Sequence, residues 1–275
     1  MSFAIDPESH PFFSYNLLIV EEFYGISEVS MAGLYGKGIF TTIAIRKTKP
    51  FRWEEHWRRL TSAAARTGVD LTEHSEESTC KALDDLIAKN RVENGRARVT
   101  FLDESPSPIW SSTTKCKTSV LIMTGDLRPV PENFKLTISP FPVNSRSPLA
   151  GVKSCNYLEQ ILAFDEANHR GFHEAIRVNE NGHVTSGCMA NVFWLKEDVL
   201  FTPSLATGCL PGTTREFVLE NLECREVEAG IDELNSADAI YLTSAGLGVA
   251  TVAEYNGRKL HSRPHPIAQL LTNNY

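Results

Sequence analysis

A lysine in an unusual setting is the first residue of chemical interest. Lys153 stands in the segment 149–158, LAGVKSCNYL, just before a run that predicts a helix. A lysine attacks a carbonyl group only after it loses its proton, so this chemistry needs a partly dry, preorganised site. The segment alone also fits an ordinary solvated surface lysine.

A second segment has the features of an anion-binding turn. Residues 210–215 read LPGTTR, where Pro211 and Gly212 predict a turn and Thr213 and Thr214 stand at the start of a helix. Free backbone N–H groups, two hydroxyls and the helix dipole favour an anion there. An ordinary capped helix would have the same features.

A third segment, 54–60, reads EEHWRRL. On a helix His56, Arg59 and Leu60 share one face, and an inward-facing arginine beside apolar neighbours requires an anionic partner such as phosphate. A surface helix with Glu–Arg pairs is the alternative.

Alternating and periodic apolar runs predict the elements that position these segments. Strands are expected over 16–20, 39–46, 98–102, 119–124, 135–139, 175–178, 192–195 and 239–243, and helices over 53–67, from 76 onward, 156–169 and 215–222. Gly68 ends the first helix, Ser75 caps the second, and Asn-Gly pairs at 181–182 and 256–257 predict hairpins.

The mixture of hairpins and helices predicts an α/β (α+β) protein of two domains. The Pro-bearing stretch 127–132 predicts a linker between a small N-terminal α/β domain, 1–126, and a larger C-terminal domain, 133–275, which carries Lys153. Ligand sites often form between such domains.

Composition and charge limit the classes of partner and the location that we expect for the chain. The chain has 275 residues, 42% hydrophobic and 22% charged, with a formal net charge of −7 and no basic run, which disfavours nucleic-acid and acidic-membrane partners. The N-terminus lacks the basic start of a signal peptide, and the apolar run 17–20 is too short to span a bilayer. Six scattered cysteines form no Cys-x-x-Cys pair, which predicts reduced thiols, no metal site and a cytoplasmic protein.

The order and spacing of the segments resemble the class IV (fold-type IV) pyridoxal-phosphate enzymes, which include branched-chain aminotransferases, D-amino-acid aminotransferases and aminodeoxychorismate lyases. The resemblance runs from Tyr35 to about Val252. It rests on GLYGKGIFTT (33–42), His56-x-x-Arg59-Leu60, KSCNYL (153–158), Asn191-Val-Phe193, Thr202-Pro203 and LPGTTR (210–215).

The resemblance implies a two-domain fold, pyridoxal 5′-phosphate (PLP) bound between the domains, and a homodimer. It implies that Lys153 forms the Schiff base and then moves a proton. It also implies that Arg59, Thr213 and Thr214 bind the cofactor phosphate. By the same resemblance, Tyr157 lies near the phenolic oxygen and Phe40 lines the substrate pocket.

One departure from the family concerns the pyridine nitrogen. The family usually has a glutamate five residues before the Asn of Asn-x-Phe, and this chain has Ser186 there. A serine hydroxyl shares a hydrogen bond with the nitrogen but cannot hold a proton on it by charge. We expect the cofactor ring to withdraw electrons less strongly. Losing a charge-assisted contact in the transition state would raise the activation free energy by an amount on the order of 1.5–3 kcal/mol.

Other departures bear on the substrate. Some members have a basic residue four positions after the pocket Phe, where this chain has Ala44. Arg46 and Arg98 are the other candidates for binding a substrate carboxylate. Alternatively, both are arginines on the surface of their strands. Thr41-Thr42 and NYLEQIL (156–162) resemble aminodeoxychorismate lyases.

Three hypotheses follow. The chain is an aminotransferase acting on an amino acid and a 2-oxo acid, or a lyase of the aminodeoxychorismate type that releases pyruvate. The third hypothesis, which Ser186 keeps open, is a non-catalytic member that binds PLP or a phosphorylated ligand.

Overall fold

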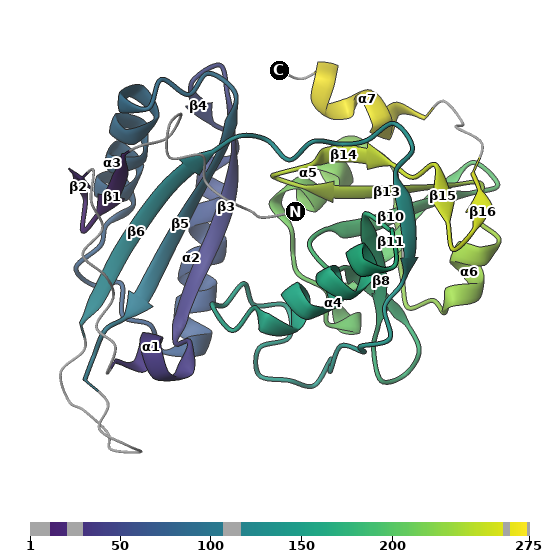
Figure 1. The fold of residues 1–275 in the computed structure, drawn as a ribbon, viewed down its shortest axis with the longest axis horizontal. Helices are drawn as coiled ribbons and strands as arrows, with labels where there is room; N and C mark the ends of the chain where they lie inside the picture. The colour runs from purple at the N-terminus through teal and green to yellow at the C-terminus, as the bar shows by residue number, and fades with distance from the viewer. Residues whose placement is uncertain (1–11, 21–29, 107–116, 261–264, 274–275) are drawn as a thin grey trace. The chain divides into compact units, whose positions relative to one another are not determined.

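The computed structural model describes residues 12–20, 30–106, 117–260 and 265–273 (Figure 1). The predictions made for residues 1–11 and for Cys116 lie outside this part of the chain. The described chain divides into two compact units. The first comprises Met1–Leu127 and Val152–Asn156, and the second comprises Arg128–Gly151 and Tyr157–Tyr275.

The first unit is built on a six-stranded sheet with strand order β2-β1-β6-β5-β3-β4. Its strands are β1 (Phe13–Tyr15), β2 (Leu18–Val20), β3 (Gly38–Arg46), β4 (Lys49–Pro50), β5 (Gly95–Asp103) and β6 (Thr118–Gly125), and its helices are α1 (Met31–Tyr35), α2 (Trp53–Thr67) and α3 (Glu76–Lys89). The core joins β3 residues such as Ile39 and Ile43 to Leu60 of α2 and Leu83 and Leu86 of α3. Both long helices therefore cover the sheet with their apolar faces.

Helix α2 is the element that the sequence predicts most closely. Its buried positions include His56, Leu60 and Ala64, which follow helical spacing, and it ends at Gly68 in the left-handed conformation, φ +67°. Ser75 caps α3 by accepting a hydrogen bond from the backbone N–H of Ser78 at 3.1 Å, as predicted.

The second unit contains two five-stranded sheets, ordered β12-β11-β10-β13-β14 and β16-β15-β7-β8-β9. Their strands are β7 (Lys135–Ile138), β8 (Glu174–Val178), β9 (Val184–Gly187), β10 (Asn191–Lys196), β11 (Val199–Pro203), β12 (Arg225–Val227), β13 (Ala239–Ser244), β14 (Gly248–Thr251), β15 (Glu254–Tyr255) and β16 (Arg258–Lys259). The helices are α4 (Leu158–His169), α5 (Thr213–Asn221), α6 (Ile231–Asn235), α7 (Pro266–Asn273) and the 3₁₀ turn η1 (Leu205–Thr207).

The second unit has its main core between its two sheets. Leu136 and Ile176 of one sheet belong to the same buried cluster as Val192, Trp194 and Leu242 of the other. A further cluster joins the first-named sheet to α5 and α7, and another joins α4 to β8. The order of layers is therefore helix, sheet, sheet, helix.

Local sequence signals explain most turns and also one error. The Asn256-Gly257 pair, with both residues at positive φ, joins β15 to β16, as predicted, and a turn at Gly182 joins β8 to β9. The strand expected over 16–20 is wrong in part. Asn16 and Leu17 adopt left-handed φ values of 47° and 67° and form the turn between β1 and β2, so only 18–20 is a strand.

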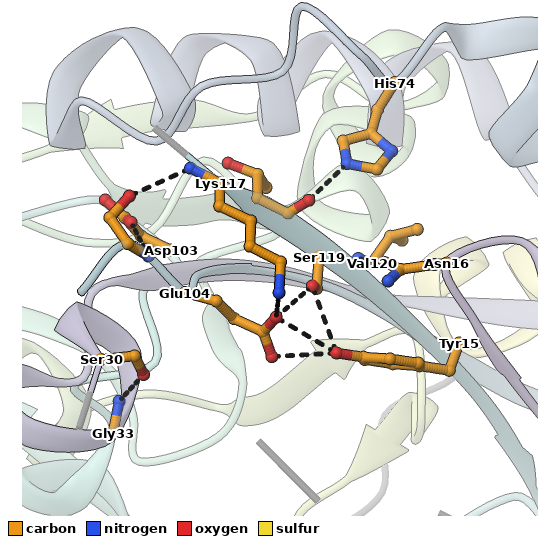
Figure 2. Close-up of polar contacts among 12 residues, drawn as sticks. Tyr15, Asn16, Ser30, Gly33, His74, Asp103, Glu104, Lys117, Ser119 and Val120 are labelled. Carbon is orange, nitrogen blue, oxygen red and sulfur yellow. Dashed lines mark hydrogen bonds and ion pairs between the residues drawn. The ribbon is translucent and has the colours of Figure 1, made fainter. Parts of the chain in front are cut away.

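One buried carboxylate of the first unit lies among hydrogen-bond donors (Figure 2). Glu104 accepts hydrogen bonds from Tyr15 at 3.0 Å and from the Ser119 hydroxyl, and Lys117 lies 3.5 Å away. We call these four residues the Glu104 cluster. Tyr15 lies in β1 and Ser119 in the adjacent strand β6, so the cluster links these two neighbouring strands.

Within the described chain, no helix has the length and apolar character needed to cross a bilayer.

Candidate active site

The backbone on both sides of Lys153 is held by β3. The N–H of Phe40 donates to the carbonyl of Lys153 at 2.9 Å, and the N–H of Cys155 donates to the carbonyl of Gly38 at 2.8 Å. Ser154 thereby pairs with Ile39 in an antiparallel bridge. A Cβ at Gly38 would come within 2.9 Å of the Cys155 sulfur, so only glycine allows this close approach. Sequence alone assigned Lys153 to the domain after the linker, whereas this pairing groups it with the first unit.

The amine of Lys153 is partly buried and lies in a positively charged setting. Its Nζ is 4.5 Å from the centroid of the Phe40 ring. Burial is the largest cause that lowers the pKa of Lys153 well below its ordinary value, and the charges of Arg59 and Arg98 lower it further. The amine is therefore biased toward the unprotonated, nucleophilic form.

A phenylalanine connects the lysine to a second cation. Phe40 is 3% exposed, and the guanidinium carbon of Arg98 lies 3.6 Å from its ring centroid. The Nε of Arg98 also donates to the Thr100 hydroxyl at 3.1 Å. We call Lys153, Arg59, Arg98 and Phe40 the Lys153 cluster. The structure thus brings together four of the residues that the sequence selected.

Arg59 reaches this cluster from α2. Its terminal nitrogen donates to the Thr41 hydroxyl at 2.6 Å and lies 3.4 Å from Nδ1 of His56. The Thr41 oxygen is in turn 2.6 Å from the same Nδ1. His56 and Thr41 were not selected as site residues from the sequence, although the spacing of His56 and Arg59 on one helical face was visible there.

Arg46 lies apart from the Lys153 cluster. It occupies the end of β3 beside the turn to β4, where it pairs with Lys49. It lies six positions after Phe40 along the strand, a span of about 20 Å. Arg98 is therefore the better placed of the two candidate arginines.

The second unit contains the helix expected over 215–222, which starts two residues earlier than expected. Helix α5 begins at Thr213 with Gly212 as its N-cap, and Thr213 and Thr214 are 5% and 6% exposed. The side chain of Asn191 donates to the carbonyl of Leu210 at 2.8 Å, and a Cβ at Gly212 would collide with the Asn191 oxygen. Asn191 and Gly212 therefore shape the loop that exposes the first N–H groups of the helix.

Ser186 lies in β9 directly opposite Arg177 of β8, so their side chains share one face of the sheet. Arg177 is 2% exposed and donates to the carbonyls of Phe141 and Pro142 at 3.2 and 2.9 Å. The charged neighbour of Ser186 across the strands is thus a cation.

A buried carboxylate that the sequence analysis missed, Glu174, lies on the other face of β8 and β9. A Cβ built on Gly187, the residue after Ser186, would lie 3.3 Å from the Glu174 side chain. Burial raises the pKa of Glu174, although Arg128 lies 3.5 Å away. By strand alternation Glu174 and Ser186 point to opposite faces, so Glu174 does not stand in for a carboxylate at 186.

Tyr157 is partly buried and stands at the N-cap of α4. Among the residues described, no group of three or more His, Cys, Asp or Glu side chains is arranged to hold a metal ion.

Comparison with known proteins places these features in one family. The model of the family amino-transferase class IV matches residues 38–255. The chain is 29% identical over 225 residues to an aminodeoxychorismate lyase of Bacillus subtilis, covering 78% of this chain and 76% of that protein. It is 28% identical over 243 residues to a putative branched-chain-amino-acid aminotransferase of Methanocaldococcus jannaschii, covering 84% and 82%.

A solved structure supports the same assignment. The crystal structure of a branched-chain aminotransferase from Thermoproteus uzoniensis with norvaline matches with a TM-score of 0.87 at 25% identity, covering 96% of this chain and 92% of that one. The match confirms the predicted fold-type IV architecture. The chain belongs to the amino-transferase class IV family of enzymes, whose members depend on PLP.

Proposed function

We propose that the chain is a PLP-dependent aminotransferase that moves an amino group between an amino acid and a 2-oxo acid. The observation that supports it most directly is the amine of Lys153, whose pKa is lowered first by burial and then by Arg59 and Arg98. A cofactor that carries an aldehyde requires an unprotonated amine at neutral pH.

Residues of each unit have the chemistry that a phosphorylated pyridine aldehyde requires. In this proposal the guanidinium of Arg59, held by Thr41, binds the phosphate, and the N-terminal N–H groups of α5 with the hydroxyls of Thr213 and Thr214 are further donors. Tyr157 is assigned to the phenolic oxygen. When bound, PLP supplies an aldehyde that takes up the amino group and a ring that withdraws electrons from the substrate α carbon.

The side chains of the Lys153 cluster have separate tasks in this proposal. Lys153 takes the proton from the α carbon of the amino acid and returns it, which its lowered pKa permits near neutral pH. Arg98 binds the substrate carboxylate, since its guanidinium is held over the Phe40 ring beside the Lys153 amine. Phe40 excludes water beside the Lys153 amine.

Ser186 is assigned to the ring nitrogen of PLP. Its hydroxyl offers a hydrogen bond without negative charge, and Arg177 opposite it adds a positive charge on the same face. We therefore expect slow amino transfer. Ser186→Glu would raise kcat by tens of times, on the order of 2 kcal/mol, whereas Ser186→Gln, of equal size and without charge, would not. Equal rates for the two variants would show that charge at 186 does not limit the reaction.

A lyase that releases pyruvate is the second candidate. The Thr41-Thr42 pair and the similarity to the Bacillus subtilis aminodeoxychorismate lyase favour it. Assays with a panel of amines, with and without a 2-oxo acid, separate the two reactions. Product that requires the 2-oxo acid supports transfer, and pyruvate formed from aminodeoxychorismate without it supports elimination.

Borohydride reduction of the protein with PLP, followed by peptide mapping, tests the cofactor and the lysine together. We expect the label on the peptide that contains Lys153, and a label on any other lysine would contradict the proposal. A protein that binds PLP at Lys153 but turns over no amine would be the non-catalytic member considered above. We further infer a cytoplasmic homodimer whose substrate is a small molecule, either an amino acid or an amine.

A further inference from the structure

The hydrogen bonds behind Arg59 have one consistent direction. A guanidinium only donates, so the Thr41 oxygen is the acceptor of the 2.6 Å contact with Arg59. The hydroxyl proton of Thr41 then points to Nδ1 of His56, also at 2.6 Å. Because Arg59 lies 3.4 Å from that same Nδ1, a hydrogen on it would face the guanidinium hydrogens. These contacts assign to His56 the neutral tautomer that has its proton on Nε2, an assignment made from the hydrogen-bond network.

The surroundings of His56 keep it in that state. The residue is 2% exposed. Burial lowers the pKa of His56 well below its ordinary value, and the charges of Arg59, Lys153 and Arg52 add to the effect. A protonated ring would make Nδ1 a donor and would break its bond with Thr41.

We propose that Thr41 and His56 are positioning residues that orient the guanidinium of Arg59 toward a phosphate group. This inference rests on the proposed function, because PLP is the source of the phosphate. Both residues are uncharged, so they fix the direction of Arg59 without neutralising it. A carboxylate at position 41 would fix it equally well but would compete with the phosphate for its charge.

The absence of charge on Thr41 and His56 also affects the pKa of Lys153. The positive charge of Arg59 is one of the causes that lower the pKa of Lys153. A partner that cancelled this charge would return the pKa of Lys153 toward its ordinary value, and less amine would be unprotonated at neutral pH. The same two residues thus orient Arg59 for the phosphate and preserve the charge that lowers the pKa of Lys153.

The first experiment compares PLP with pyridoxal, which lacks the phosphate. We expect Thr41→Val to weaken PLP binding by about tenfold or more while pyridoxal binding stays within about twofold, because only PLP uses Arg59. Thr41→Ser, which keeps the hydroxyl, should restore the affinity. Thr79→Val is the matched control, since Thr79 is equally buried but donates to Ser75 at the start of α3.

The second experiment tests the direction of the hydrogen bonds at His56. His56→Asn keeps an acceptor at the position of Nδ1 and should retain most of the PLP affinity, whereas His56→Gln places its amide farther out and should match Thr41→Val. Nitrogen NMR of the imidazole should show a neutral ring with the proton on Nε2 at pH 7.

The outcomes separate this inference from the proposed function. If the wild type forms no covalent adduct with either PLP or pyridoxal, the proposed function fails. If it binds PLP but Thr41→Val loses affinity for PLP and pyridoxal equally, or loses none, the positioning role is wrong. A His56 proton on Nδ1 would also overturn it.

Discussion

The first unit contains two polar clusters whose central groups have opposite electrostatic surroundings. In the Glu104 cluster a carboxylate receives hydrogen bonds from Tyr15 and Ser119 and lies 3.5 Å from the ammonium of Lys117. In the Lys153 cluster an amine lies near two guanidinium groups and over an aromatic ring. The first arrangement gives its central group hydrogen-bond donors and an opposite charge, whereas the second places its central group beside like charges, which lower the pKa of Lys153.

The difference shows which cluster raises the free energy of unfolding and which one lowers it. A carboxylate surrounded by donors contributes to stability, because removing it leaves buried donors without partners. An amine beside two cations carries a cost in the folded protein, and only a ligand with negative charge relieves it. We therefore expect substitutions in the Glu104 cluster to change stability and those in the Lys153 cluster to change function.

The largest expected effect is that of Lys153→Met. Activity should fall by at least about a thousandfold, because both the attachment point of PLP and the proton-transfer group are lost. The cofactor-free variant should unfold at the same urea concentration as the wild type or a higher one, since an amine held beside two guanidinium groups is replaced by an apolar chain of similar length. Steady-state kinetics and urea titration measure the two quantities. A clear loss of stability would contradict the comparison.

Glu104→Gln should show the opposite pattern. We expect the free energy of unfolding to fall by about 1–3 kcal/mol, because the amide cannot accept every bond that the carboxylate accepts. The borohydride label at Lys153 should be unchanged. Glu73→Gln, an exposed change of the same kind, is the control for the loss of one negative charge. If Glu104→Gln altered PLP binding at unchanged stability, the two clusters would not be independent.

The sequence predicted the long elements of the fold because their signals are local. The apolar spacing over 53–67 coincides with α2, and the Asn256-Gly257 pair forms its hairpin. The turn at Asn16 and Leu17 was missed, since a leucine at positive φ has no compositional signal. The short helices α1 and α6 were missed because each is too short to show an apolar periodicity.

The site was predictable as a set of residue types but not as an arrangement. Lys153 was selected from its neighbours in sequence, yet its place beside Phe40 depends on the bridge between Ser154 and Ile39, which no local pattern encodes. Thr41 was visible only as a departure from the family. Its contact with Arg59 requires β3 and α2 to pack together.

The last expected effect is a gradual dependence of stability on pH that belongs to Lys153. The pKa of Lys153 is lower in the folded protein than its value of 10.5 in the unfolded chain. Between those two values the unfolded chain binds a proton that the folded protein does not, so the free energy of unfolding rises with pH there. The slope is at most about 1.4 kcal/mol per pH unit.

Lys153→Met removes this one contribution and leaves the other titrating groups in place. We expect the cofactor-free variant to be more stable than the wild type, by a margin that shrinks as the pH rises from 7 to 10. The margin shrinks because the free energy of unfolding of the wild type rises with pH while this contribution is absent from the variant. Urea titrations of both proteins at pH 7, 8, 9 and 10 measure the margin. A margin that stays constant over this range would show that the amine has its ordinary pKa, and the contrast between the two clusters would then rest on geometry alone.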